Sequence, residues 1–247
     1  MKLRTIIIKI GGKILENKND LNSTIDQIQL LLKEYIIQNV VIIPGGGTRA
    51  NFVRHLDSEF NLGDDLSHWM AIYAMDLNGI LIKEDYPFIK LIKDFNKLKN
   101  EICHPKNDQI LVFQPYDYLK NKNPLPHSWN VTSDSITLHL AKKLGLNEIY
   151  LIKNVDGLMI KEGENIRLIK RISYMEYEKF LRSQDFKIDG KPSSEIKKSK
   201  PIDKYSLTLI KKYNIPCIIL NGTKGKFRIQ NYFKEQKEDD KYYSIIF

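Results

Sequence analysis

Two glycine-rich turns carry the strongest chemical signal in the sequence, and each directly follows a run of β-branched residues. The first turn reads Lys9-Ile10-Gly11-Gly12-Lys13, and the second reads Pro44-Gly45-Gly46-Gly47. Residues without a Cβ let backbone N–H groups approach phosphate oxygens, and a neighbouring lysine adds a compact positive charge. Lys9 lies in a run that otherwise reads as buried, where a charge needs a partner or a ligand. The two turns therefore predict an anion site, with a simple tight turn as the alternative for each.

Two later segments combine carboxylates with small polar residues. Residues 128–135 place Thr132, Ser133 and Asp134 at the start of an expected helix, where they can cap the helix or position phosphoryl oxygens and lysines. The fourth segment contains Asn154-Val155-Asp156-Gly157, for which an ordinary Asp-Gly turn is the alternative. Neither glycine turn matches the Walker motif, the dinucleotide fingerprint or the protein-kinase motifs. Phosphate chemistry in this chain therefore requires another architecture.

Alternating strands and helices must position these segments. Strands are expected over residues 5–10, 40–43, 88–92, 109–114, 148–152, 166–170, 216–220 and 242–246. Helices are expected over residues 23–38, around 50–56, and over 66–82, 94–100, 133–144, 173–182, 201–212 and 227–235. Continuous apolar strands that alternate with helices predict an α/β fold with a mostly parallel sheet covered on both faces. The polar segment 183–200 predicts a mobile loop.

Composition excludes several classes of protein. The chain has 247 residues, of which 42% are hydrophobic, and this length can form one large α/β domain. No stretch approaches the roughly 18 uncharged residues of a membrane-spanning helix, and the chain shows no leader, so a cytoplasmic location is expected. Cys103 and Cys217 have no ligand spacing, which argues against a disulfide framework or a structural zinc site.

The net charge of the chain does not identify the kind of molecule that it binds. Lysine and arginine number 39 against 30 acidic residues, giving a formal charge of +9. The lysines are spread along the chain and are not collected into one arm, which favours a solvated basic surface over a nucleic-acid patch. The same cations would suit an anionic small molecule such as a phosphate ester or a nucleotide.

The four segments, in this order and spacing, resemble the amino acid kinase family, which includes carbamate, acetylglutamate, aspartate, uridylate and isopentenyl phosphate kinases. In that family the turns read K-x-G-G-S and P-G-G-G or similar, an aspartate begins a later helix, and the fourth segment reads D-V-D-G or T-D-V-x-G. The resemblance covers essentially the whole chain. It implies a three-layer αβα sandwich with a mainly parallel central sheet in one domain over residues 1–247. About residues 1–125 would form an acceptor-binding lobe, and about 126–247 a nucleotide-binding lobe.

A narrower resemblance lies in residues 67–76, Ser-His-Trp-Met-Ala-Ile-Tyr-Ala-Met-Asp, and in residues 129–136. Both are similar to an archaeal branch of the family that includes [5-(aminomethyl)furan-3-yl]methyl phosphate kinases. The chain also departs from the family pattern. Lys13 replaces the usual serine, and the C-terminal G-M-x-x-K pattern is not clearly present. Lys204 is the expected equivalent of that lysine, with Lys198 and Lys200 as alternatives.

The resemblance implies in-line transfer of the γ-phosphoryl group from ATP to a small anionic acceptor, most simply a phosphate monoester that becomes a diphosphate. Mg²⁺ would accompany ATP through phosphates and water, with no protein residue assigned as its ligand. Catalysis is assigned to Lys9, Asp134 and Lys204, with Asp134 orienting the two lysines. Nucleotide and phosphate binding is assigned to Gly11, Gly12, Lys13, Lys153, Asp156, Gly157 and Leu158. Acceptor binding is assigned to Gly45, Gly46, Gly47, Arg49, Arg54, Asn130, Thr132 and Ser133.

Several alternatives remain open at the level of sequence. Arg49 and Arg54 can grip an anionic acceptor or form surface salt bridges. His68, Trp69 and Trp129 are expected to pack and not to recognise substrate. The family suggests a homodimer or a higher homo-oligomer, without nucleic-acid or membrane partners. A carboxylate or carbamate kinase, a non-catalytic nucleotide- or oxyanion-binding protein and a basic nucleic-acid-binding protein are the alternative functions.

Overall fold

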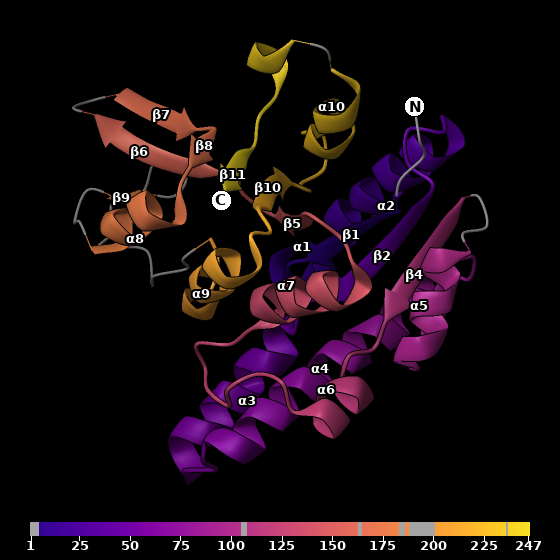
Figure 1. The fold of residues 1–247 in the computed structure, drawn as a ribbon, viewed down its shortest axis with the longest axis vertical. Coiled ribbons are helices and arrows are strands. Elements are labelled where there is room, and N and C mark those ends of the chain that lie inside the picture. Colours follow the sequence, from indigo (N-terminus) through magenta and orange to yellow (C-terminus); the bar gives the residue numbers. More distant parts are fainter. Residues whose placement is uncertain (1–4, 105–107, 163–164, 183–185, 188–200, 236) are drawn as a thin grey trace.

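A computed structural model of the chain describes residues 5–104, 108–162, 165–182, 186–187, 201–235 and 237–247. One eight-stranded sheet runs through the molecule in the order β3-β4-β2-β1-β5-β10-β11-β8 (Figure 1). Its strands are β1 (Thr5–Ile10), β2 (Asn39–Pro44), β3 (Lys90–Ile92), β4 (Gln109–Phe113), β5 (Ile149–Lys153), β8 (Arg171–Ile172), β10 (Cys217–Asn221) and β11 (Ser244–Ile246). The β10–β11 pair is antiparallel, and all other neighbours in this sheet are parallel.

Helices cover both faces of the sheet. They are α1 (Gly12–Glu16), α2 (Lys18–Lys33), α3 (Gly47–Phe60), α4 (Asp64–Asp85), α5 (Phe95–Cys103), α6 (Tyr116–Lys122), α7 (Ser133–Leu144), α8 (Tyr174–Arg182), α9 (Lys204–Tyr213) and α10 (Arg228–Lys234). Alternate residues of β1 divide the core, since Ile7 belongs to the cluster with α7 and α9 and Ile8 to the cluster with α2 and α10. The expected three-layer α/β sandwich is therefore confirmed.

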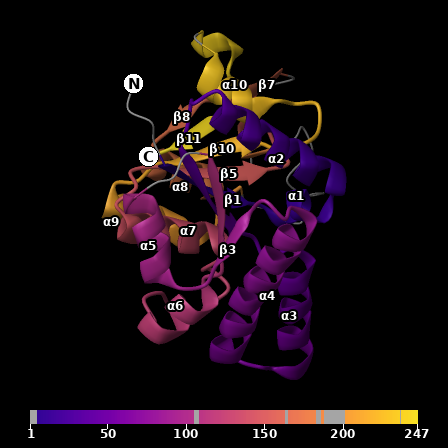
Figure 2. The same ribbon diagram turned by 90° about the vertical axis from the view of Figure 1, so that its right-hand side faces the viewer.

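Two features lie outside the main layers. The small antiparallel sheet β7-β6-β9 contains β6 (Leu158–Glu162), β7 (Asn165–Ile169) and β9 (Phe186–Lys187). Helices α3 and α4 lie side by side and project beyond the sheet (Figures 1 and 2). In the described part of the chain, no helix is long and apolar enough to cross a membrane.

Local capping explains where the structure departs from the expected helix boundaries. The helix expected over 23–38 begins at Lys18 because the side chain of Asn17 accepts hydrogen bonds from the N–H groups of Asn19 and Asp20. The helix expected from Pro201 begins at Lys204 because Asp203 provides its cap. Helices α1 and α6 are too short to give a clear periodic signal. The mobile loop expected over 183–200 falls outside the described residues, apart from β9.

The parallel register brings the turns that follow β1, β2 and β5 to one edge of the sheet. Ile10 at the end of β1 pairs with Pro44 of β2 on one side and with Ile152 of β5 on the other. The residues that follow these positions therefore meet at the carboxyl edge, where open α/β sheets bind ligands.

Candidate active site

A buried carboxylate between two lysines forms the centre of the candidate site. Asp134, in the first turn of α7, contacts the Nζ of Lys9 with Oδ1 at 2.9 Å and the Nζ of Lys153 with Oδ2 at 2.7 Å. Lys9 lies on β1 and Lys153 ends β5, so two neighbouring strands and one helix build the cluster. Lys9 is 6% exposed and Asp134 is 3% exposed. The expected pairing of Lys9 with Asp134 is present in the structure.

Opposing effects of burial and charge set the protonation states of this cluster. Burial favours the neutral carboxyl of Asp134, but the charges of Lys153 and Lys9 outweigh it and lower its pKa to about 2. Burial lowers the pKa of Lys9 to about 8, Asp134 opposes that shift, and Lys153 adds to it. Near neutral pH the cluster therefore carries one negative and two positive charges, which leaves a net positive charge for phosphate oxygens.

The lowered pKa of Lys9 predicts a pH dependence. Lys9 keeps its proton below pH 8 and loses it as the pH rises through about 8. We therefore expect kcat/KM for ATP to fall above pH 8, because that parameter reports the free enzyme. Replacing Asp134 with asparagine removes a charge that raises this pKa, so residual activity should decline at a lower pH. A wild-type profile that stays flat to pH 10 would contradict the assignment.

Contact between the two glycine turns limits which N–H groups can reach a ligand. The N–H of Gly11 donates to the Ile152 carbonyl at 2.8 Å, and the N–H of Gly45 donates to the Ile10 carbonyl at 2.8 Å. The expectation that these two N–H groups bind phosphate is therefore wrong, because they extend the sheet. A Cβ on Gly12 would lie 2.5 Å from the Cα of Gly47, so the turns pack too closely for any side chain.

The remaining turn glycines suit an anion better. Gly12 and Gly47 are the first residues of α1 and α3, and Gly46 precedes α3 as its cap residue. N–H groups in the first turn of a helix have no intrahelical acceptor and lie at the positive end of the helix dipole. Glu16 already uses one such group, since its carboxylate accepts from the N–H of Thr48.

Arg49 holds the second glycine turn in place. It does not line the pocket that lies beside Lys9 and the two turns. Its Nη1 donates to the Oδ1 of Asn78 at 2.7 Å. The Nδ2 of Asn78 donates in turn to the carbonyls of Gly45 at 2.6 Å and Gly46 at 3.0 Å. The expected grip of Arg49 on an acceptor is therefore replaced by a positioning role. Asn78 gave no signal in the sequence because it is one amide within a long helix.

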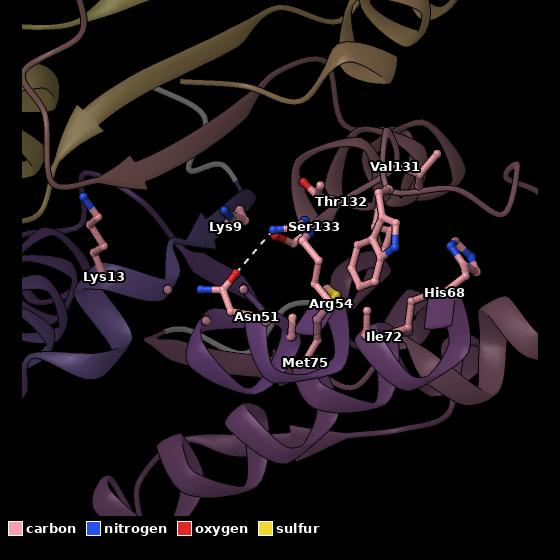
Figure 3. A pocket seen from close by; sticks show the side chains of 18 of the residues that line it. Lys9, Lys13, Asn51, Arg54, His68, Ile72, Met75, Val131, Thr132 and Ser133 are labelled. Carbon is pink, nitrogen blue, oxygen red and sulfur yellow. Dashed lines mark hydrogen bonds between the residues drawn. The ribbon is translucent and has the colours of Figure 1, made fainter. Parts of the chain in front are cut away.

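A pocket of about 270 Å³ opens beside Lys9 and both turns. Figure 3 shows Lys9 towards one end and His68 at the other, with Arg54, Ile72 and Met75 between them. The pocket is lined by Lys9, Gly12, Lys13, Glu16, Gly45, Gly46, Gly47, Ala50, Asn51, Arg54, His68, Ala71, Ile72, Met75, Ser128, Trp129, Val131, Thr132, Ser133 and Ile136. His68 and Trp129, which the sequence assigned to packing, thus also face the pocket.

Arg54 is placed to meet an anion. Its guanidinium carbon lies 4.5 Å from the ring centroid of Trp129, and its Nη1 is 3.4 Å from the Oδ1 of Asn51. The indole is fixed because its Nε1 donates to the Oδ2 of Asp57 at 2.7 Å. Arg54 forms no ion pair with any carboxylate of the described residues, so its charge remains available to a ligand.

Asp203 fixes the loop that carries the polar residues of the pocket. Its Oδ2 accepts from the N–H of Thr132 at 3.0 Å, from the Oγ1 of Thr132 at 2.8 Å and from the N–H of Ser135 at 3.0 Å. Its Oδ1 accepts from the hydroxyls of Ser135 and Ser206 and from the N–H of Ser206. One carboxylate thus ties the start of α7 to the start of α9. The sequence identified the local segment but could not reveal this contact.

Lys204 does not lie beside Asp134, so the expected contact between these two residues is wrong. It is exposed at the start of α9 and lines a different pocket, with Tyr174, Glu178 and Lys211. Lys153 occupies the place beside Asp134 that the sequence assigned to Lys204. The alternatives Lys198 and Lys200 lie outside the described residues.

Four other candidates also stand apart from the pocket. The carboxylate of Asp156 binds the Nε of Arg228 at 3.0 Å. A Cβ on Gly157 would meet the Oγ of Ser244 at 2.3 Å, and the N–H of Leu158 donates to that hydroxyl at 2.7 Å. Asn130 is exposed. Gly157 and Leu158 therefore join the start of β6 to Ser244 of β11, and Asp156 binds the start of α10.

Comparison with known proteins gives a consistent result. A family model described as the amino acid kinase family matches residues 4–221. The chain is 32% identical over 221 residues to [5-(aminomethyl)furan-3-yl]methyl phosphate kinase of Methanocaldococcus jannaschii, with 87% of each chain covered. It is 23% identical over 242 residues to uridylate kinase of Pyrococcus abyssi, with 94% of this chain and 96% of the relative covered.

Solved structures share the fold. UMP kinase from Ureaplasma parvum superposes with a TM-score of 0.67 at 19% identity, covering 100% of this chain and 99% of the other. Uridylate kinase from Archaeoglobus fulgidus superposes with a TM-score of 0.64 at 15% identity, covering 99% of this chain and 100% of the other.

Proposed function

The chain belongs to the amino acid kinase family and is an ATP-dependent small-molecule kinase, and we propose that it phosphorylates a phosphate monoester to give a diphosphate. The observation that carries this proposal is the Lys9–Asp134–Lys153 cluster beside a pocket that Arg54 also lines. The M. jannaschii relative is named for a phosphate monoester, and the P. abyssi relative for uridylate. Both names describe acceptors that already carry phosphate.

Positioning and charge neutralisation would supply the catalysis. An acceptor phosphate oxygen is already an anionic nucleophile, so in-line transfer needs no covalent intermediate. Lys9 and Lys153 would neutralise charge on the transferring phosphoryl group, and Asp134 would hold their ammonium groups in place. Arg54 and the first N–H groups of α1 and α3 would hold the acceptor phosphate and the transferring group.

The two halves of the chain would divide the substrates. We assign the acceptor to about residues 1–125, because 14 of the 20 residues that line the pocket come from this half of the chain. ATP is assigned to about residues 126–247, with Thr132 and Ser133 reaching across to the acceptor. Mg²⁺ would be held by ATP phosphates and water. In the described ranges, no group of three or more His, Cys, Asp or Glu residues could hold a metal. We place the reaction in the cytoplasm.

Loss of Arg54 should weaken acceptor binding. We expect Arg54→Met to raise KM for a phosphate monoester by roughly ten- to a hundred-fold, because a charge-assisted hydrogen bond is lost. KM for ATP should change little. Arg171→Met is the matched control, since Arg171 lies over the Phe247 ring away from the pocket. Steady-state kinetics measure all of these values, and an unchanged acceptor KM in Arg54→Met would remove Arg54 from the site.

An ADP-release screen tests the proposed reaction. Purified protein would be given ATP, magnesium and one acceptor at a time from four classes: alkyl and aryl phosphates, nucleoside monophosphates, carboxylates and carbamate. We expect ADP with phosphate monoesters and none with the other acids, and Asp134→Asn serves as the inactive control. ADP formed only with carboxylates or carbamate would overturn the proposed acceptor class.

We also propose that the chain forms a homodimer or a higher homo-oligomer. Large apolar side chains are exposed on the projecting helices α3 and α4, among them Phe52, Leu66 and Tyr73. Such a patch is typical of an interaction surface. Light scattering should give a mass of at least twice 28.9 kDa. Tyr73→Glu should reduce that mass to the monomer's, and a wild-type monomer at micromolar concentration would contradict the proposal.

A further inference from the structure

A largely buried imidazole, which has no hydrogen-bond partner among the described residues, lies at the far end of the pocket. His68 on α4 is 6% exposed and is one of the residues that line the pocket. No other described residue forms a hydrogen bond with its ring. Because no described residue pairs with it, the ring can offer a nitrogen to a ligand that enters the pocket.

Neighbouring rings hold His68 in one orientation. It stacks on His127 with ring centroids 4.6 Å apart and meets Trp69 edge to face at 5.0 Å. His127 is itself fixed, because its Nε2 lies 2.6 Å from the Oδ1 of Asn123 and its Nδ1 pairs with Asp65. An imidazole with fixed neighbours can recognise a ligand group without losing much conformational freedom on binding.

His68 is also held in its neutral form. Burial lowers its pKa to about 4, and the charges of His127 and Lys120 add to that effect against the opposing charge of Asp65. A neutral imidazole has one donor nitrogen and one acceptor nitrogen, whereas the protonated ring only donates. Its surroundings thus preserve a lone pair at any pH at which the enzyme would work.

The position of His68 separates it from phosphoryl transfer. Figure 3 shows it at the opposite end of the pocket from Lys9, with Ile72 and Met75 between them. Both of these side chains are buried and apolar. An acceptor whose phosphate lies beside Lys9 and Arg54 would therefore cross an apolar section before it reached His68.

We propose that His68 is a specificity-determining residue, which accepts a hydrogen bond from a hydroxyl or amino group at the end of the acceptor remote from its phosphate. This rests on the proposed function in taking the acceptor to be a phosphate monoester. The acceptor class is thereby narrowed to monoesters with an apolar middle and a distal hydrogen-bond donor. The edge-to-face contact with Trp69 then serves to hold His68 in place.

Matched esters would test this proposal by calorimetric binding and by ADP release. The probes are benzyl phosphates with a para-hydroxymethyl, para-aminomethyl or para-ethyl group, which have nearly the same shape. We expect wild-type protein to bind a donor-bearing ester roughly ten- to a hundred-fold more tightly than the ethyl ester. His68→Phe should abolish the preference, His68→Gln should restore part of it, and KM for ATP should stay unchanged in both.

A second buried histidine provides the control. His139 is buried on α7, with its ring nitrogens 3.5 Å from the hydroxyls of Tyr118 and Tyr213, and does not line the pocket. His139→Phe should keep the wild-type preference. Equal binding of the three esters by wild-type protein, or a preference that survives in folded His68→Phe, would overturn the role of His68. Selective binding without any ADP release would instead refute the proposed kinase reaction and leave the role of His68 intact.

Discussion

Asp134→Asn is expected to lower kcat by about a hundred- to a thousand-fold or more. The carboxylate contacts both Lys9 and Lys153 in the interior, and an amide of the same shape cannot carry the charge that holds the two ammonium groups. The lysines would then repel each other, and Lys9 would lose its proton more readily because Asp134 raises its pKa. Rapid-quench or steady-state assays of ADP formation measure the effect.

Loss of the fold would not account for this result. Asn replaces Asp without a change in size, and the cap of α7 comes from Thr132, whose side chain accepts from the N–H of Asp134. Circular dichroism should therefore give a native spectrum with a cooperative melt. Wild-type turnover in the purified variant would contradict the assignment of Asp134 to the catalytic centre.

Lys153→Met is the substitution with the second largest expected effect. Comparing it with Lys204→Met tests whether the catalytic lysine is the one that the structure places beside Asp134 or the one that the family motif suggested. We expect Lys153→Met to lower kcat by about a hundred-fold or more, because a cation beside the transferring group is lost. Lys204→Met should retain close to wild-type kcat, since Lys204 is exposed in a different pocket. The same ADP assay measures both variants. A severe loss in Lys204→Met with a normal rate in Lys153→Met would reverse the assignment.

Lys153 and Lys204 show which site residues could be predicted from the sequence and which could not. Lys9 and Asp134 were found because a charge within an apolar strand and a carboxylate at a helix start are local signals. The expected strand over residues 5–10 agrees with β1, since its continuous apolar run has one simple interpretation. Lys204 was chosen as the equivalent of the lysine in the family's C-terminal pattern, and that resemblance does not determine which side chain faces Asp134.

Residues that act through contacts distant in sequence were missed for the same reason. Asp203 accepts hydrogen bonds from Thr132 and Ser135, which lie about 70 positions earlier. Asn78 supports the second glycine turn from a helix more than 30 residues away. Asn78 belongs to no local pattern, and the role of Asp203 as the cap of α9 does not indicate its contacts with α7. Only the packing of α4 and α9 reveals these longer-range contacts. Gly11 and Gly45 were misassigned because the sequence does not show that their N–H groups extend the sheet.

Phosphorus NMR of the complete reaction tests the central claim most directly. The protein would be incubated with ATP, magnesium and the phosphate monoesters of the screen, with Asp134→Asn as a parallel sample. The Lys9–Asp134–Lys153 site predicts the resonances of ADP together with a pair of coupled resonances from a new diphosphate ester, in the wild-type sample alone. Release of inorganic phosphate without a new diphosphate, or an equal diphosphate signal from Asp134→Asn, would contradict the account.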